Sequence, residues 1–131
     1  MTKTDLYCCG CQKEVAARLT AGAEIYPHRS DLAATPYWRC DGCGNFVGCH
    51  HKTSDRTRPL GSIPTPEIRA ARSKVHQALD PLWRSGRISR SDLYRAIGRG
   101  IGVAEFHTGE LRTVEMAHQV QRMAKELEQQ L

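Results

Sequence analysis

Cys8-Cys9-Gly10-Cys11 and Cys40-Asp41-Gly42-Cys43 are the two stretches that decide the fold of this 131-residue chain. Each contains two cysteines separated by two residues, and 28 residues lie between the two pairs. Two intervening residues let both sulfurs of a pair face one ion, and two such pairs supply four thiolates to a tetrahedral metal. The long gap suits a zinc ribbon. The sequence therefore predicts one structural Zn²⁺ ion held by Cys8, Cys11, Cys40 and Cys43.

The six cysteines could instead form disulfides, but the context favours a metal. The opening residues, Met1 to Asp5, do not begin a signal peptide, and no apolar run approaches the length of a membrane span. We therefore expect a cytoplasmic protein without membrane contact, in a compartment where thiols stay reduced. A zinc ion with four thiolates has no open position for water, so we expect it to be structural.

Three further side chains form a candidate additional metal or polar site, namely Cys49, His50 and His28. A neighbouring histidine can activate a thiolate, and both residue types bind metals. The plainer interpretation is that Cys49 and His50 follow a ribbon strand and pack against the second cysteine pair. Cys9 is left over by the preferred ligand set and is expected to be a small buried group or an exposed thiol.

Short strands are expected around both cysteine pairs. Residues 6–26 have the outline of a β-hairpin, with a turn signal at residues 20–22. Residues 27–36 are expected to form a loop. Tyr37-Trp38-Arg39 and Phe46-Val47 then predict strands on either side of the second pair.

The second half of the chain predicts helices. Thr65-Pro66-Glu67 is typical of a helix start, and Asp80-Pro81 predicts a break in that helix. Ser89 predicts the start of another helix that ends in the glycines from Gly98 onward. Thr113 predicts the start of a last helix, with an inner stripe of apolar residues at Met116, Val120, Met123 and Leu127.

Residues 52–66 are polar and rich in proline, so we place a boundary in this region. We assign residues 1–58 to a zinc-ribbon domain and residues 59–131 to a helical domain with a basic face. The predicted fold class is α+β, with an N-terminal zinc ribbon of short β-hairpins packed on three to four C-terminal helices.

The chain has a formal net charge of +5, and the excess is concentrated in residues 66–112. Five arginines lie within sixteen residues of that segment, and between them only Asp92 is acidic: Arg84, Arg87, Arg90, Arg95 and Arg99. Guanidinium groups bind phosphates in a bidentate manner, and the nearby Trp83 and Tyr94 could stack on bases. These arginines are the candidate residues for binding nucleic acid or a protein partner.

Several stretches resemble a zinc-finger-containing domain family of unknown function from phages, prophages and bacteria. The similarity covers most of residues 7–110 and is carried in order by Ile25-Tyr26-Pro27-His28-Arg29, Tyr37-Trp38-Arg39-Cys40, Val47-Gly48-Cys49-His50, Pro59-Leu60-Gly61, Ala71-Arg72 with His76, and Asp80-Pro81-Leu82-Trp83-Arg84 with Gly86. The resemblance implies a zinc finger at the four cysteines already named, an origin in a phage or mobile element, and therefore a bacterial host cell. Cys9 departs from the proline usual in such a first cysteine pair.

Three functional hypotheses follow. The first is a small non-enzymatic zinc-binding protein of a phage or mobile element that binds nucleic acid through its basic helical face. The second is an inhibitor that binds a host nucleic-acid-processing or defence complex. The third and weakest is a metal-dependent nuclease using His28, Cys49, His50 or His51, since the chain lacks a phosphate-cradling glycine loop, a nucleophile elbow and a zinc-protease helix.

Overall fold

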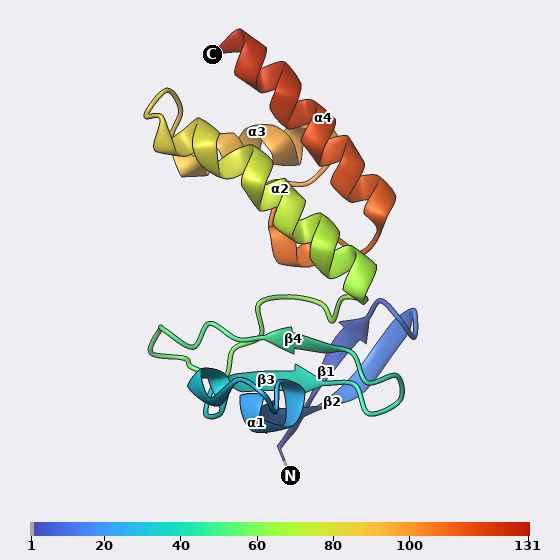
Figure 1. The fold of residues 1–131 in the computed structure, drawn as a ribbon. Coiled ribbons are helices and arrows are strands. Elements are labelled where there is room, and N and C mark those ends of the chain that lie inside the picture. Colours follow the sequence, from blue (N-terminus) through green and yellow to red (C-terminus); the bar gives the residue numbers. More distant parts are fainter. Residues whose placement is uncertain (1) are drawn as a thin grey trace. The chain divides into compact units, whose positions relative to one another are not determined.

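The computed structural model describes residues 2–131, and the chain divides into two compact units, Met1–Pro66 and Glu67–Leu131. The first unit contains a four-stranded antiparallel sheet, and the second contains three long helices (Figure 1). The fold class is therefore α+β, as the sequence predicts. Within residues 2–131, every helix is too short or too polar to serve as a membrane span.

The sheet brings apolar side chains together on one of its faces. Its strands are antiparallel neighbours in the order β1 (Lys3–Cys8), β2 (Lys13–Ala21), β3 (Pro36–Arg39) and β4 (Phe46–Gly48). Leu6 lies opposite Val15, and Leu19 lies opposite Trp38, which in turn lies opposite Val47. Because successive side chains of a strand point to opposite faces, these five lie on the same face, where they belong to one apolar cluster.

The first hairpin differs from the predicted one. Its turn was expected at residues 20–22, but β2 continues to Ala21, and the turn is the first cysteine pair, which joins β1 to β2. The sequence-based prediction missed β1 because Lys3, Thr4 and Asp5 give it a polar start. Its backbone pairs with β2 over all six of its residues, so pairing outweighs composition. A four-residue helix, α1 (Gly22–Ile25), begins where the turn was expected.

Residues 49–63 fold back along the sheet. Cys49 forms an antiparallel bridge with Pro59, and the Leu60 amide donates to the Gly48 carbonyl at 3.0 Å. The Trp38 indole N–H donates to the Thr57 carbonyl at 2.6 Å, which fixes the preceding loop. We call residues 59–63 the strap. It follows the predicted domain boundary, and it belongs to the compact unit that ends at Pro66.

The second unit is built from the helices α2 (Pro66–Arg84), α3 (Arg90–Ile101) and α4 (Val114–Gln130). The predicted caps are present: Ser89 accepts from the Asp92 amide at 3.0 Å, and Thr113 accepts from the Met116 amide at 3.1 Å. A short 3-10 turn, Thr108–Glu110, lies between α3 and α4.

The helices share one apolar core. Its fully buried members include Val75 and Leu79 of α2, Leu93 and Ile97 of α3, and Val120 of α4. The predicted inner stripe of α4 is partly correct, because Val120 is buried and Met123 and Leu127 pack against the core, whereas Met116 is exposed.

One predicted helix end is wrong. The helix α2 does not break at Asp80-Pro81 but continues to Arg84. Proline costs a helix one hydrogen bond, and here the loss is offset because Leu79 and Leu82, on either side, are buried in the core. The helix α3 ends within the predicted run of glycines: it continues past Gly98 and is capped by Gly102, whose φ of 87° is the left-handed conformation of a helix cap.

Candidate metal centre

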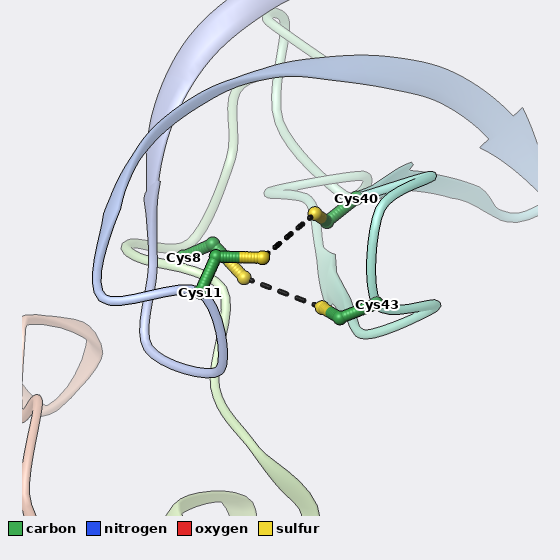
Figure 2. A group of neighbouring side chains, drawn as sticks. All are labelled: Cys8, Cys11, Cys40 and Cys43. Atoms are coloured by element: carbon green, nitrogen blue, oxygen red, sulfur yellow. Dashed lines mark hydrogen bonds between the residues drawn. The ribbon is translucent and has the colours of Figure 1, made fainter.

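The sheet places the two cysteine pairs next to each other. The first pair closes the β1–β2 hairpin, and the second pair joins β3 to β4. Figure 2 shows the sulfurs of Cys8 and Cys11 facing those of Cys40 and Cys43. Two segments far apart in the sequence are thus fixed by strand pairing with their sulfurs directed at one point.

The two turns have the same backbone geometry. The Gln12 amide donates to the Cys8 carbonyl at 2.7 Å, and the Gly44 amide donates to the Cys40 carbonyl at 2.7 Å. Gln12 has a φ of 56° and Gly44 a φ of 82°, so the residue after each pair adopts the left-handed conformation. Glycine is suited to that conformation, whereas a glutamine is strained by about 1 kcal/mol or more. The repetition of this turn indicates that the backbone is shaped to direct two sulfurs at a time.

The distances between the sulfurs fit a tetrahedral metal. Cys8 Sγ lies 3.5 Å from Cys43 Sγ, and Cys11 Sγ lies 3.8 Å from Cys40 Sγ. All four sulfurs lie within 4.8 Å of one another. With Zn–S bonds of about 2.3 Å, the sulfurs of a regular tetrahedron would lie about 3.8 Å apart. A disulfide needs about 2.05 Å, and all four cysteines are free thiols.

The electrostatics of the site also call for a cation. Burial raises the pKa of the Cys8 thiol to about 12, and the neighbouring Cys40 sulfur raises the pKa of Cys11. Burial also opposes ionisation of Cys40, but hydrogen bonds from the backbone amides of Cys43 and Gly42 lower its pKa below the ordinary value. Backbone donors therefore favour the thiolate form of Cys40, and a divalent ion would offset half of the charge of four thiolates.

A network of charged residues supports the second cysteine pair. Asp41 accepts from Arg18 Nε at 2.8 Å and from Arg18 Nη2 at 2.9 Å, and Arg39 is a further donor to it. Arg18 Nη2 also donates to Glu24 at 2.8 Å. Arg18 holds the pKa of the Asp41 carboxyl at about 2, so Asp41 ties its turn to β2. Sequence reasoning missed this contact, because Arg18 and Asp41 are 23 residues apart.

The strap covers the first cysteine pair. The Cys9 amide donates to the Ile63 carbonyl at 2.8 Å, and the Ile63 amide donates to the Tyr7 carbonyl at 2.8 Å. Cys9 is buried, and its sulfur lies 3.9 Å from Ser62 Oγ instead of joining the other four sulfurs. The side chain of Cys9 therefore belongs to the packing beneath the strap.

Among residues 2–131, no group of three or more metal-ligating side chains includes Cys49, His50 or His28. Cys49 is buried in the apolar core of the sheet, and burial raises the pKa of its thiol to about 11. His50 is half-buried, and His28 is exposed in the loop after α1. Within residues 2–131, the only group of three or more side chains placed to share a metal is the four-cysteine group. The additional site stays a prediction from the sequence.

The five candidate arginines lie in the helical unit. Arg84 ends α2, Arg87 lies in the following turn, and the other three belong to α3: Arg90, Arg95 and Arg99. All five are exposed. Tyr94 is only 3 % exposed, however, so it is not available to stack on bases, and the prediction for this side chain is wrong. Trp83 is half-buried, packs against the helical core and donates to Asp80 Oδ1 at 3.1 Å.

The fold and the four sulfurs define a zinc-ribbon protein with one structural zinc ion. A family model described as a zinc-finger-containing domain matches residues 4–127, and the chain belongs to this family. Comparison with curated proteins and with solved structures found no match. Cys8, Cys11, Cys40 and Cys43 would hold the ion, which would tie the two turns together and offset half of the charge of their thiolates.

Proposed function

We propose that this zinc-binding protein contacts nucleic acid through its helical unit. The contact surface, here called the arginine surface, consists of Arg84, Arg87, Arg90, Arg95 and Arg99. The observation that carries the proposal is the exposure of all five guanidinium groups along one short segment. An origin in a phage or mobile element is proposed on the sequence resemblance alone.

The arginine surface is only weakly neutralised by the protein itself. Arg84 lies 3.9 Å from Asp80, and Arg95 lies 3.4 Å from Asp92. Exposed ion pairs of this kind contribute about 0–1 kcal/mol, so a phosphate can replace the carboxylate at little cost. Among residues 2–131, no ion pair engages Arg87, Arg90 or Arg99. Most of this positive charge is therefore available to a partner.

Two of the guanidinium groups are held by aromatic rings. Arg90 lies over the ring of Tyr94, 4.5 Å from its centroid, and Arg84 lies 5.3 Å from the centroid of Trp83. Stacking of this kind restrains an arginine side chain and leaves its N–H groups free to donate in the plane of the guanidinium. Such restrained arginines lose less entropy when they bind a phosphate.

Salt dependence of binding is the test. Fluorescence anisotropy with labelled single-stranded and duplex oligonucleotides would measure the affinity of the wild type, of Arg95→Gln/Arg99→Gln and of the control Lys52→Gln/Arg56→Gln. Both variants lose two positive charges, but the control loses them from an exposed loop of the sheet unit. Each phosphate contact on a duplex contributes about −0.9 to the slope of log affinity against log salt.

We expect the arginine variant to bind more weakly and to reduce that slope by about 1.8, and the control to change neither. When salt is raised from about 50 to about 200 mM, the affinity of the wild type should therefore fall about 12-fold more than that of the arginine variant, which lacks two phosphate contacts. Binding that does not depend on salt, or no binding at low salt, would contradict the proposal. A stoichiometric protein recovered from a nuclease-treated bacterial lysate would instead support the inhibitor hypothesis.

A further inference from the structure

Side chains of α2 and α4, the two helices shown in Figure 1, line a groove in the helical unit. Its volume is about 450 Å³. Three basic side chains, one amide and one methyl group line it: His118, Arg122, Lys125, Gln121 and Ala78. A space at the small end of the usual range for ligand sites, of about 300–1,000 Å³, is suited to one nucleotide unit.

The lining of the groove follows from the helical repeat of α4. His118, Gln121, Arg122 and Lys125 are separated by steps of three and four residues, so they share one side of the helix. The core-facing side of the same helix is formed instead by Ala117, Val120 and Ala124. The four polar residues lie beside this apolar face. Because the apolar face packs α4 against the core, it also sets the positions of the groove residues.

The basic groups of the groove are not used in ion pairs within the described part of the chain. Among residues 2–131, no ion pair engages His118, Arg122 or Lys125. Lys74 is also exposed and lies one helical turn before Ala78 on α2, so it adds a cation to the same side of that helix. Arg122 and Lys125 therefore give the groove a positive charge that attracts a ligand with negative charge.

The groove is separate from the arginine surface. Ala78 and Arg84 are six residues apart on α2, so their directions differ by about 120° around the helix axis. The other arginines lie in the turn after α2 and on α3, whereas the remaining groove residues all lie on α4. A ligand in the groove would therefore make contacts that the arginine surface does not make.

We propose that this groove binds a phosphate group of a nucleic-acid strand and is a second contact beside the arginine surface. The inference rests on the proposed function for its ligand class. The Arg122 guanidinium would donate through its fork, Lys125 would supply a point charge and the Gln121 amide would donate a further hydrogen bond. Ala78 forms the wall of the groove with the smallest side chain, which leaves room for the sugar–phosphate unit.

The small wall residue permits a test that leaves every cation in place. Ala78→Glu would introduce a carboxylate into the groove, and Ala78→Gln would introduce a neutral side chain of nearly the same shape. Both are good helix formers, so both should keep α2 folded, which thermal melting would verify. Backbone amide NMR would follow titrations with short oligonucleotides and with inorganic phosphate.

We expect oligonucleotide to shift the amide signals of Gln121, Arg122 and Lys125 in the wild type and in Ala78→Gln, but not in Ala78→Glu. At about 0.1 M salt, Ala78→Glu should bind about tenfold more weakly than Ala78→Gln, with a salt slope smaller by about 1 to 2. If the two variants bound equally well and no amide signal of α4 shifted, the groove proposal would be refuted. This would hold even if mutation of the arginine surface weakened binding.

A failure of the proposed function would look different. One such outcome is that no oligonucleotide binds, whereas inorganic phosphate shifts the same α4 amide signals in Ala78→Gln and not in Ala78→Glu. The groove would then be a binding site for a free phosphate ligand, and a nucleic-acid strand would be excluded as its ligand. If neither probe shifted α4 in any form of the protein, the groove proposal would be refuted outright.

Discussion

Replacing one cysteine at a time should separate the metal ligands from the extra cysteine beside them. The informative pair is Cys43→Ser and Cys9→Ser. Cys43 is an exposed member of the four-sulfur group, so its replacement removes a ligand while changing little packing. Cys9 is buried in the other cysteine turn, and its sulfur lies next to Ser62.

The magnitude follows from the ligand count. Structural zinc sites bind with about 10–16 kcal/mol at pH 7, so each of four ligands contributes about 2.5–4 kcal/mol. Loss of one ligand should therefore weaken zinc binding by about 10²- to 10³-fold. Cys9→Ser should leave the zinc affinity unchanged, although loss of a buried sulfur would lower the stability of the sheet unit by about 1–2 kcal/mol.

Two measurements would check this prediction. Native mass spectrometry would give the number of zinc ions per chain, and competition with a chromophoric chelator would give the relative affinity. Cys11→Ser, which removes a half-buried ligand, should behave like Cys43→Ser. If Cys9→Ser lost zinc as readily as Cys43→Ser, or if Cys43→Ser kept the affinity of the wild type, the assignment of ligands would be refuted.

Four further predictions concern the metal and the fold. Removal of zinc by a chelator should unfold the sheet unit, because its core has few large side chains. The helices of 19, 12 and 17 residues should keep most of their circular dichroism at 222 nm, because they have a core of their own. Loss of the helical signal together with the sheet would contradict the independence of the two cores. Asp41→Asn should weaken zinc binding by about 10-fold because Arg18 would lose the charged acceptor that ties β2 to the second cysteine pair, whereas Asp31→Asn, which disrupts a more exposed arginine pair away from the sulfurs, should have no effect in the same competition assay. The pKa of Asp41 is lowered from 3.8 to about 2, so the contribution of its ion pair is complete above about pH 4 and is lost as the pH falls toward 2; loss of zinc at milder acidity would therefore reflect protonation of the thiolates. Gly98→Ala should lower the stability of the helical unit by about 1–3 kcal/mol in thermal melting, since its Cβ would lie 2.8 Å from the Val103 carbonyl oxygen; an unchanged melting temperature would show that the loop after α3 yields.

Local patterns in the sequence predicted much of this architecture. The spacing of the cysteines is sufficient to select the four ligands over Cys9, since it states directly which sulfurs can face one ion. Helix starts were also predictable, because Ser89 and Thr113 cap helices through side chains only three residues from the amides that they accept. Both kinds of signal lie within a few residues of chain.

The features that were missed depend on distant parts of the chain. Strand β1 is specified by its partner β2 rather than by its own composition. The helix α2 continues through Pro81 because Leu79 and Leu82, on either side of the proline, are buried in the core. The contact between Arg18 and Asp41 and the groove at Ala78 join segments that the sequence separates. Charge counting drew attention to the middle of the chain, whereas α4, whose basic side chains line the groove, has nearly balanced charges overall.

The order of the metal ligands along the chain has a consequence for biosynthesis. All four ligands precede residue 44, and a ribosome adds about 5–20 residues per second, so the metal centre is complete roughly 4–18 s before residue 131 is added. The strap follows the last ligand by roughly 1–4 s. A nascent chain can therefore capture its ion before Ile63 is available to bond to the backbone of Tyr7 and Cys9, so metal binding does not have to wait for the strap.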